Sequence, residues 1–269
     1  MQNWIDLLSQ PTQEMLYQPL AVRARAAETN SAFLHDPEAI ELCLKLNLPG
    51  RKNLTKVSRI ESHRIAARAV HYDQIVRRHL QDRPDLVVVN LGAALDTRFY
   101  RVDNGRLRWY DIDMPDVIHF RRQHLPLRER VTELGLSPFD PAWPHQVVYE
   151  DPGQLLFLAE NLFAYHQESE IRRLLELLAS AFPGASLCCD IQSRRAKRGR
   201  PNHPFVFLLD RAEELKHLEY RLRISQIWPV GSLYVENQPQ LVRLRNRLPA
   251  VCRTNQIMVL TFNEPPRHA

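Results

Sequence analysis

The stretch Asp85-Leu86-Val87-Val88-Val89-Asn90-Leu91-Gly92 is short, rich in β-branched residues and almost continuously apolar. Such a run is typical of a strand buried in a parallel sheet, because helices cover both faces of that kind of sheet. Its closing glycine allows a tight turn and a close approach of the backbone to a ligand. A single glycine is weak evidence for a nucleotide site, since the dinucleotide fingerprint needs three.

Strands and helices are expected to alternate on the C-terminal side of this run. Further strands are predicted at 107–112, 131–136, 155–159, 185–191, 221–228 and 256–262, with helices at 168–182, 210–218 and 238–248, whereas the first 80 residues are predicted to be helical, at 16–28, 38–46 and 60–80. This alternation predicts a mostly parallel sheet with helices on both faces. We expect one domain in three parts: a helical cap (1–80), a ligand-binding core (84–192) and a C-terminal part (193–269) that completes the sheet and carries substrate-side insertions.

Two aspartates end the second predicted strand, about 20 residues after Gly92, in Trp109-Tyr110-Asp111-Ile112-Asp113-Met114-Pro115. An acidic residue at this distance accepts hydrogen bonds from the ribose hydroxyls of a nucleotide in many α/β folds. Asp111 and Asp113 alternate with Ile112, so both are expected on the same face and either could serve. Alternatively, Asp113 only caps the helix that Pro115 begins.

Composition and charge are those of an ordinary globular protein: 269 residues, 44% apolar, 25% charged and a net charge of +5. A basic cluster (Arg194, Arg195, Lys197, Arg198 and Arg200) is interpreted as a solvated loop, with an anionic substrate or nucleic acid as the alternative. The four cysteines show neither zinc nor disulfide spacing, which favours a reducing, cytoplasmic setting. Residues 1–10 do not look like a signal peptide, and no run reaches the ~18 apolar residues of a membrane span.

The longer string Val88-Val89-Asn90-Leu91-Gly92-Ala93-Ala94-Leu95-Asp96-Thr97-Arg98 closely resembles the V-V-N-L-G-A-G-L-D-T-R signature of one methyltransferase family. That family contains the leucine carboxyl methyltransferases and the tetracenomycin-type polyketide O-methyltransferases. Other matching segments follow in the family's order over about residues 20–190: His35-Asp36-Pro37, Arg68 to Asp73, Trp109 to Pro115, Ala159-Glu160-Asn161-Leu162-Phe163-Ala164-Tyr165, and Phe182-Pro183-Gly184-Ala185 with Asp190.

The resemblance implies a Rossmann-like fold with seven strands and an N-terminal helical lid, and S-adenosylmethionine as the cofactor. It also implies residue roles. Gly92 would pass beneath the methionine part of the cofactor, Asp113 would hold the ribose and Glu160 would lie near the amino group. Arg68 and Arg25 would bind the carboxylate, for which a guanidinium is well shaped. Ser137 would stand in the segment that contacts adenine.

Two positions depart from the family pattern. Ala94 replaces the second glycine of L-G-A-G, which costs about 1 kcal/mol or more if that residue has a positive φ. Ser137 stands where leucine carboxyl methyltransferases have an aspartate. Both departures leave room for a non-catalytic protein that kept the fold and binds the cofactor or a partner.

The expected function is O-methylation of an acid or a phenol by an S-adenosylmethionine-dependent enzyme. No Ser-His-Asp or paired-carboxylate arrangement stands out, in agreement with a carboxylate acceptor, which is already ionised at neutral pH. A protein C-terminal carboxylate ranks behind a small molecule as acceptor, and no membrane, nucleic acid or metal is expected. The enzymatic alternative is an oxidoreductase using a nicotinamide cofactor, against which the missing fingerprint glycines argue.

Overall fold

The computed structural model describes residues 10–50, 56–126, 128–197 and 204–263. Arg198 and Arg200 of the predicted basic loop lie outside these residues. No helix within the described ranges is long and apolar enough to cross a membrane.

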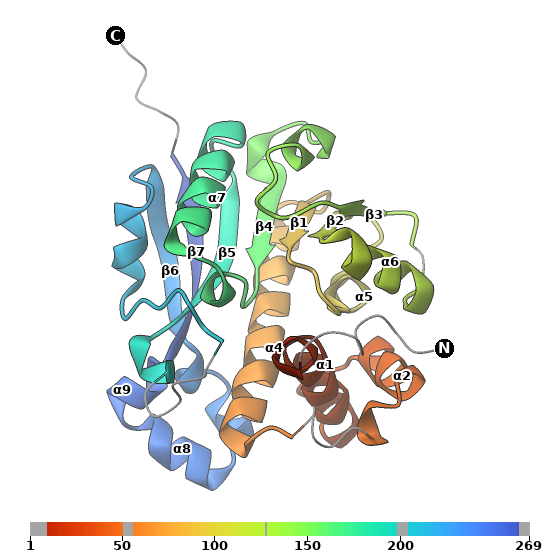
Figure 1. Cartoon of the computed structure of the whole chain (residues 1–269), viewed down its shortest axis with the longest axis vertical. Coiled ribbons are helices and arrows are strands. Elements are labelled where there is room, and N and C mark those ends of the chain that lie inside the picture. Colours follow the sequence, from red (N-terminus) through yellow and green to blue (C-terminus); the bar gives the residue numbers. More distant parts are fainter. Residues whose placement is uncertain (1–9, 51–55, 127, 198–203, 264–269) are drawn as a thin grey trace.

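A seven-stranded sheet forms the centre of the described chain, with strand order β3-β2-β1-β4-β5-β7-β6 (Figure 1). The strands are β1 (Val87–Leu91), β2 (Arg108–Asp113), β3 (Val131–Gly135), β4 (Leu155–Ala159), β5 (Ser186–Gln192), β6 (Leu222–Pro229) and β7 (Asn255–Phe262). β1 to β5 are parallel, whereas β7 pairs antiparallel with both β5 and β6. The predicted strands are confirmed within two residues at each end.

Alternate residues of the central strands enter two separate cores. Val87, Val89 and Leu91 pack with α7 (Glu168–Ala181), whereas Val88 packs with α4 (Arg59–Asp82) and α5 (Arg98–Val102). The adjacent Cys188 and Cys189 of β5 divide in the same way between the two cores, because successive side chains of a strand point to opposite faces. Helices therefore cover both faces of the sheet, as predicted.

The N-terminal helices α1 (Gln10–Thr29) and α2 (Pro37–Lys45) pack against each other beside α4. Asp36 caps α2 by accepting a hydrogen bond from the Ala39 N–H, and Ser58 caps α4 through Glu61 N. Figure 1 shows α1 beside α4 and below the ends of β1 and β4, on the side where these parallel strands terminate. This position makes α1 the roof of whatever binds at those strand ends.

The remaining helices are short. They are α6 (Pro115–His124), α8 (Gln240–Asn246), α9 (Pro249–Cys252) and the 3₁₀ turns η2 (Leu48–Gly50), η3 (Trp143–Gln146), η4 (Pro152–Gln154), η5 (Phe163–Tyr165), η6 (Arg194–Lys197), η7 (Ala212–His217), η8 (Val230–Ser232) and η9 (Val235–Asn237). The helix predicted at 210–218 is thus only the 3₁₀ turn η7. Its two buried residues, Ala212 and Leu215, are three apart, which is the repeat of a 3₁₀ helix.

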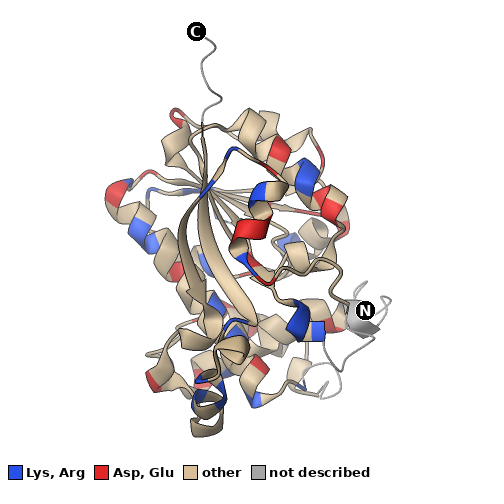
Figure 2. Ribbon diagram, turned by 90° about the vertical axis from the view of Figure 1, so that its left-hand side faces the viewer, with Lys and Arg blue, Asp and Glu red and all other residues tan. Residues whose placement is uncertain are grey.

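Figure 2 shows that basic and acidic residues are interspersed along the helices and loops of the chain. Within the predicted basic cluster, Arg194 pairs with Asp210 at 3.2 Å and with Glu214 at 3.1 Å. Neighbouring carboxylates therefore neutralise part of that cluster.

Candidate functional site

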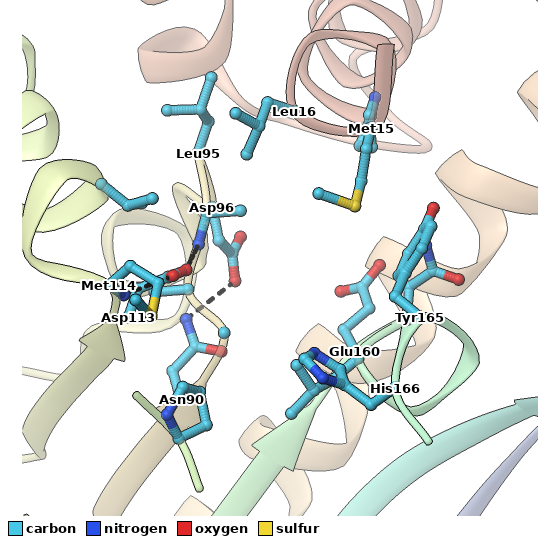
Figure 3. Close-up of a pocket in the computed structure, with 18 of the residues that line it drawn as sticks. Met15, Leu16, Asn90, Leu95, Asp96, Asp113, Met114, Glu160, Tyr165 and His166 are labelled. Atoms are coloured by element: carbon cyan, nitrogen blue, oxygen red, sulfur yellow. Dashed lines mark hydrogen bonds between the residues drawn. The ribbon is translucent and has the colours of Figure 1, made fainter. Parts of the chain in front are cut away.

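A pocket of about 520 Å³ opens at the carboxyl ends of β1, β2, β3 and β4. Its volume lies within the range of about 300–1,000 Å³ that is usual for small-ligand sites. Met15, Leu16 and Pro19 of α1 form its apolar roof, and Figure 3 shows the Met15 side chain pointing inward. Open α/β sheets bind ligands at this edge, so the pocket lies where the strand pattern predicts a site.

The loop after β1 approaches the pocket with its backbone. Gly92 has a φ of +70°, and a Cβ built on it would stand only 2.9 Å from Cδ1 of Leu162. Its N–H donates to the Ile112 carbonyl at 2.8 Å, which fixes the loop against β2. Ala94 also has a positive φ, +43°, in a region that disfavours every residue with a Cβ. The alanine at this position therefore carries the backbone strain that the family's glycine avoids.

The structure separates the two aspartates of β2. Asp113 lines the pocket, and its carboxylate accepts hydrogen bonds of 2.7 Å from the N–H groups of Ala94 and Met114. Asp111 is 1% exposed and is enclosed by Arg121, Asn90 and Trp109, so it does not reach the pocket. Burial raises the pKa of Asp113, although the two N–H groups oppose that shift. Of the two expected candidates, only Asp113 is available to a ligand.

Arg68 and Glu160 meet on the opposite wall. Nε of Arg68 donates to Oε1 of Glu160 at 2.9 Å, and Nη1 of Arg68 lies 3.9 Å from the buried Asp190. Oε2 of Glu160 accepts a second bond, from Nη2 of Arg98. Burial alone would raise the pKa of Glu160, but the Arg98 and Arg68 guanidiniums outweigh it and hold the pKa below its ordinary value. Glu160 is therefore ionised at neutral pH.

The motifs that carry the resemblance contact one another in a buried ionic network. Arg98 donates to Asp73 at 2.8 Å and to Asp96, and Thr97 donates to Asp36 at 2.7 Å. Arg101 bridges Asp73 and Asp36. Burial would raise the pKa of Asp96, but nearby arginines, Arg98 foremost, lower it to about 2. These buried charges thus hold the pocket wall together from α2, α4 and the loop after β1.

The structure places Arg25 outside the pocket. Its side chain is exposed and donates to Oγ of Ser62 at 2.7 Å. Arg23 lines the pocket instead, with Nη2 bonded to the Leu95 carbonyl at 2.7 Å and Nε 3.4 Å from Asp36. Arg23 and Arg25 are two positions apart in α1, which separates them by about 200° around the helix axis. The two side chains therefore face nearly opposite directions.

Ser137 lines the far end of the pocket together with Pro138 and Phe139. The Phe139 ring lies 4.3 Å from the ring of His166, which also lines the pocket. Burial lowers the pKa of His166, although Glu170 opposes the shift, so the imidazole is neutral at neutral pH. The two rings are tilted by 50° to each other and form an aromatic wall beside Ser137.

Some lining residues were not expected from the sequence: Met15, Arg23, Asp96, Phe139 and His166. Asp96 stands in the quoted signature and Phe139 in the segment of Ser137, so both positions offered a signal, whereas Met15, Arg23 and His166 have none that a single chain reveals. Tyr165 also lines the pocket, with Oη 3.2 Å from Nδ2 of Asn161. Burial raises the pKa of Tyr165 to about 12, so its hydroxyl stays protonated at neutral pH. Within the described residues, no group of three His, Cys, Asp or Glu side chains could hold a metal ion.

Solved structures share the architecture described above. A protein from Thermobifida fusca assigned as a methyltransferase superposes with a TM-score of 0.57 over 76% of this chain and 83% of its own, at 13% identity. Magnesium protoporphyrin IX methyltransferase (ChlM) from Synechocystis PCC 6803, solved with bound SAH, has a TM-score of 0.52 over 78% of this chain and 89% of its own, at 10% identity. The fold is the α/β fold of these methyltransferase structures.

Sequence comparison is more specific. The pattern of the leucine carboxyl methyltransferase family matches residues 17–179, and the chain belongs to this family. It is 29% identical over 180 residues to the tetracenomycin polyketide synthesis O-methyltransferase TcmP of Streptomyces glaucescens. That match covers 66% of this chain and 64% of TcmP.

Proposed function

We propose that this protein transfers a methyl group from S-adenosylmethionine to an oxygen atom of a small molecule. One observation carries the proposal: Gly92, Asp113, Ser137, Glu160 and Arg68, which the resemblance assigns to the cofactor, all line a single pocket. These residues come from four strand ends and one helix, so their convergence is a property of the fold and not of one local motif.

The pocket's chemistry fits an adenosyl amino acid. The Asp113 carboxylate suits a ribose diol, because each of its oxygens retains acceptor capacity beside the N–H group it already binds. Gly92 leaves space that a Cβ would fill. Glu160 is a carboxylate for an ammonium group, and Arg68 is a guanidinium for a carboxylate. Ser137 and the Phe139–His166 wall would border the base.

Catalysis in this proposal is chiefly positioning. S-Adenosylmethionine supplies a methyl group that is already activated by its sulfonium. The protein's residues must hold the acceptor oxygen in line with that methyl group, a form of catalysis worth several kcal/mol. Met15, Leu16 and Pro19 roof the pocket and would exclude water from an apolar acceptor. The protonated Tyr165 hydroxyl would donate a hydrogen bond to an acceptor oxygen.

The acceptor in this proposal is an apolar acid or phenol. The largely apolar roof and the similarity to an enzyme of polyketide synthesis support a small aromatic molecule. A carboxylate would need no general base because it is already ionised, whereas a phenol would have to lose its proton. The four free cysteines, three of them buried, support the accompanying proposal of a reducing, cytoplasmic setting.

Label transfer tests the proposal. The protein would be incubated with S-[methyl-³H]adenosylmethionine and matched aromatic acids and phenols, followed by mild base. A methyl ester would release labelled methanol in base, whereas a methyl ether would keep the label. The proposal expects one of these two products, and Asp113→Ala should form less of it. Label that reaches only nitrogen or sulfur acceptors would contradict O-methylation.

A further inference from the structure

The guanidinium of Arg98 joins two carboxylates of the pocket wall. Its Nη1 donates to Oδ2 of Asp96 and its Nη2 to Oε2 of Glu160, each at 2.5 Å. Asp96 follows β1 and Glu160 follows β4, two neighbouring strands of the sheet. A single side chain therefore fixes the separation of two acidic groups that the sequence places 64 residues apart.

Both carboxylates also face the pocket. Asp96 and Glu160 line it, with side chains 13% and 18% exposed, whereas Arg98 is 1% exposed and lies behind them. Figure 3 shows the two carboxylates directed into the same cavity from different loops. Each carboxylate oxygen can accept more than one hydrogen bond, so both groups keep acceptor capacity toward the cavity.

Arg98 is what allows two negative charges to stand this close. Carboxylates that share a site repel, and one of them ordinarily takes up a proton. Here Arg98 binds both, and its own third donor, Nε, is held by Asp73 at 2.8 Å. Arg101 in turn anchors Asp73 through two hydrogen bonds. The guanidinium is thus locked from behind and presents an ionised pair to the pocket.

We propose that Asp96 and Glu160 together bind the ammonium group of the cofactor's amino-acid part, with Arg98 as the positioning residue that holds the pair. An ammonium group has three N–H donors and is best satisfied by more than one acceptor. The inference rests on the proposed function and goes beyond it, because the family resemblance assigns only Glu160 to this group. Asp96 becomes a direct ligand and Arg98 acts through both carboxylates.

Calorimetry with two ligands tests this subsite. The ligands are S-adenosylhomocysteine and its analogue in which hydrogen replaces the amino group. The protein should bind S-adenosylhomocysteine about 10-fold more tightly than the analogue, or better, since hydrogen bonds between charged groups are the strong ones. In Asp96→Asn this preference should fall to about 3-fold or less, with the affinity for the analogue changed little.

Asp73→Asn is the matched control. It makes the same chemical change on another carboxylate bound to Arg98, but Asp73 does not line the pocket. It should lower Tm while keeping the preference within about 2-fold of the original, because the asparagine amide oxygen can still accept from Nε of Arg98 and both pocket carboxylates remain in place. Arg98→Lys supplies a second variant, because a lysine cannot bridge both carboxylates as the forked guanidinium does. The preference for S-adenosylhomocysteine over the analogue should therefore fall in this variant. The fall should be larger at pH 6 than at pH 8.

The outcomes separate the two proposals. An undiminished preference in Asp96→Asn, or in Arg98→Lys if Asp96→Asn does not fold, would overturn the subsite and leave the cofactor assignment standing. Equal affinity of the unaltered protein for both ligands would do the same. Failure of the unaltered protein to bind either ligand would overturn the cofactor assignment and the subsite with it.

Discussion

The backbone N–H of Ala94 donates a 2.7 Å hydrogen bond to Oδ2 of Asp113, and it does so from a left-handed conformation. The strained residue of the loop after β1 is thus the one that anchors the carboxylate assigned to the ribose. The positive φ is retained although the glycine of the family pattern is absent. The bond to Asp113 and the burial of Leu95 and Ala93 on either side stabilise the conformation.

Ala94→Gly should therefore stabilise the protein. Removing the Cβ relieves the cost of a positive φ, partly offset by the greater freedom of glycine in the unfolded chain, for a net gain of about 0.5–1 kcal/mol. Ala93→Gly is the control, because Ala93 is buried and has no positive φ, and it should destabilise. Thermal unfolding of both variants measures this. Equal losses of Tm in the two variants would show that Ala94 carries no strain.

Gly92→Ala should destabilise the protein by about 2 kcal/mol or more, because it combines a positive φ with a clash. The clash would be with Leu162, 2.9 Å from the added Cβ. Gly105→Ala separates the two effects, since Gly105 has a φ of +79° but no atom within 4 Å of an added Cβ. Urea unfolding should therefore show a smaller loss for Gly105→Ala. Equal losses of unfolding free energy in the two variants would show that the contact with Leu162 contributes nothing to the cost.

The ionisation of Asp96 should make the free energy of unfolding depend on pH in a particular way. Its pKa is about 2 in the folded protein against an ordinary value of 3.8, so its ionised form stabilises the fold on the order of 2 kcal/mol at neutral pH. Because the folded pKa is the lower one, this contribution is fully present above about pH 4 and is lost as the pH falls toward 2.

The unfolding free energies of the unaltered protein and Asp96→Asn should consequently differ most near pH 6 and converge below pH 4. Urea titrations at several pH values measure the difference. Asp103→Asn is the comparison, since Asp103 is exposed and its carboxylate binds Arg130 and the Gly105 N–H at the surface, and it should cost less than about 1 kcal/mol throughout. A difference for Asp96→Asn that does not change between pH 6 and pH 3 would contradict the ionic role of Asp96.

Strand positions were predictable because each buried strand is a short apolar run, and helix positions were predictable from helical spacing and, for some helices, from a start signal. The Asp36-Pro37 start of α2 is an example in which the expected cap is observed. The 3₁₀ form of η7 was not predictable, since apolar residues three apart also fit an α-helix. Only the tertiary packing of Ala212 and Leu215 decides between the two.

The site was predictable where the motif fixes a residue at a strand end, as at Gly92, Asp113 and Glu160. The site was less predictable on α1, which carries both Arg23 and Arg25. Only the orientation of this helix about its axis decides which of the two arginines reaches the pocket. Arg98 shows a different limit. The sequence displays it in the signature, but its contacts to Asp73, Asp96 and Glu160 arise from three other parts of the chain.

Arg23 and Arg25 should differ in their effect on ligand binding. Arg25→Met should change the affinity for S-adenosylhomocysteine less than about 2-fold, because an exposed side chain bonded to Ser62 contributes little. Arg23→Met should lower the affinity or Tm clearly, since Arg23 is buried beside Asp36 and lines the pocket. Calorimetry and thermal unfolding of both variants measure this. A larger loss of affinity in Arg25→Met than in Arg23→Met would indicate that Arg25 binds the carboxylate of the cofactor.

The central claim is that the pocket binds an adenosyl amino acid through the carboxylate at the end of β2. Calorimetric titration with S-adenosylhomocysteine of the unaltered protein, Asp113→Ala and the surface control Asp103→Ala tests it most directly. We expect binding to the unaltered protein and to Asp103→Ala, and a loss of 1 kcal/mol or more, about 5-fold, in a folded Asp113→Ala. Absence of binding to the unaltered protein up to millimolar ligand, or equal affinity in Asp113→Ala, would contradict it.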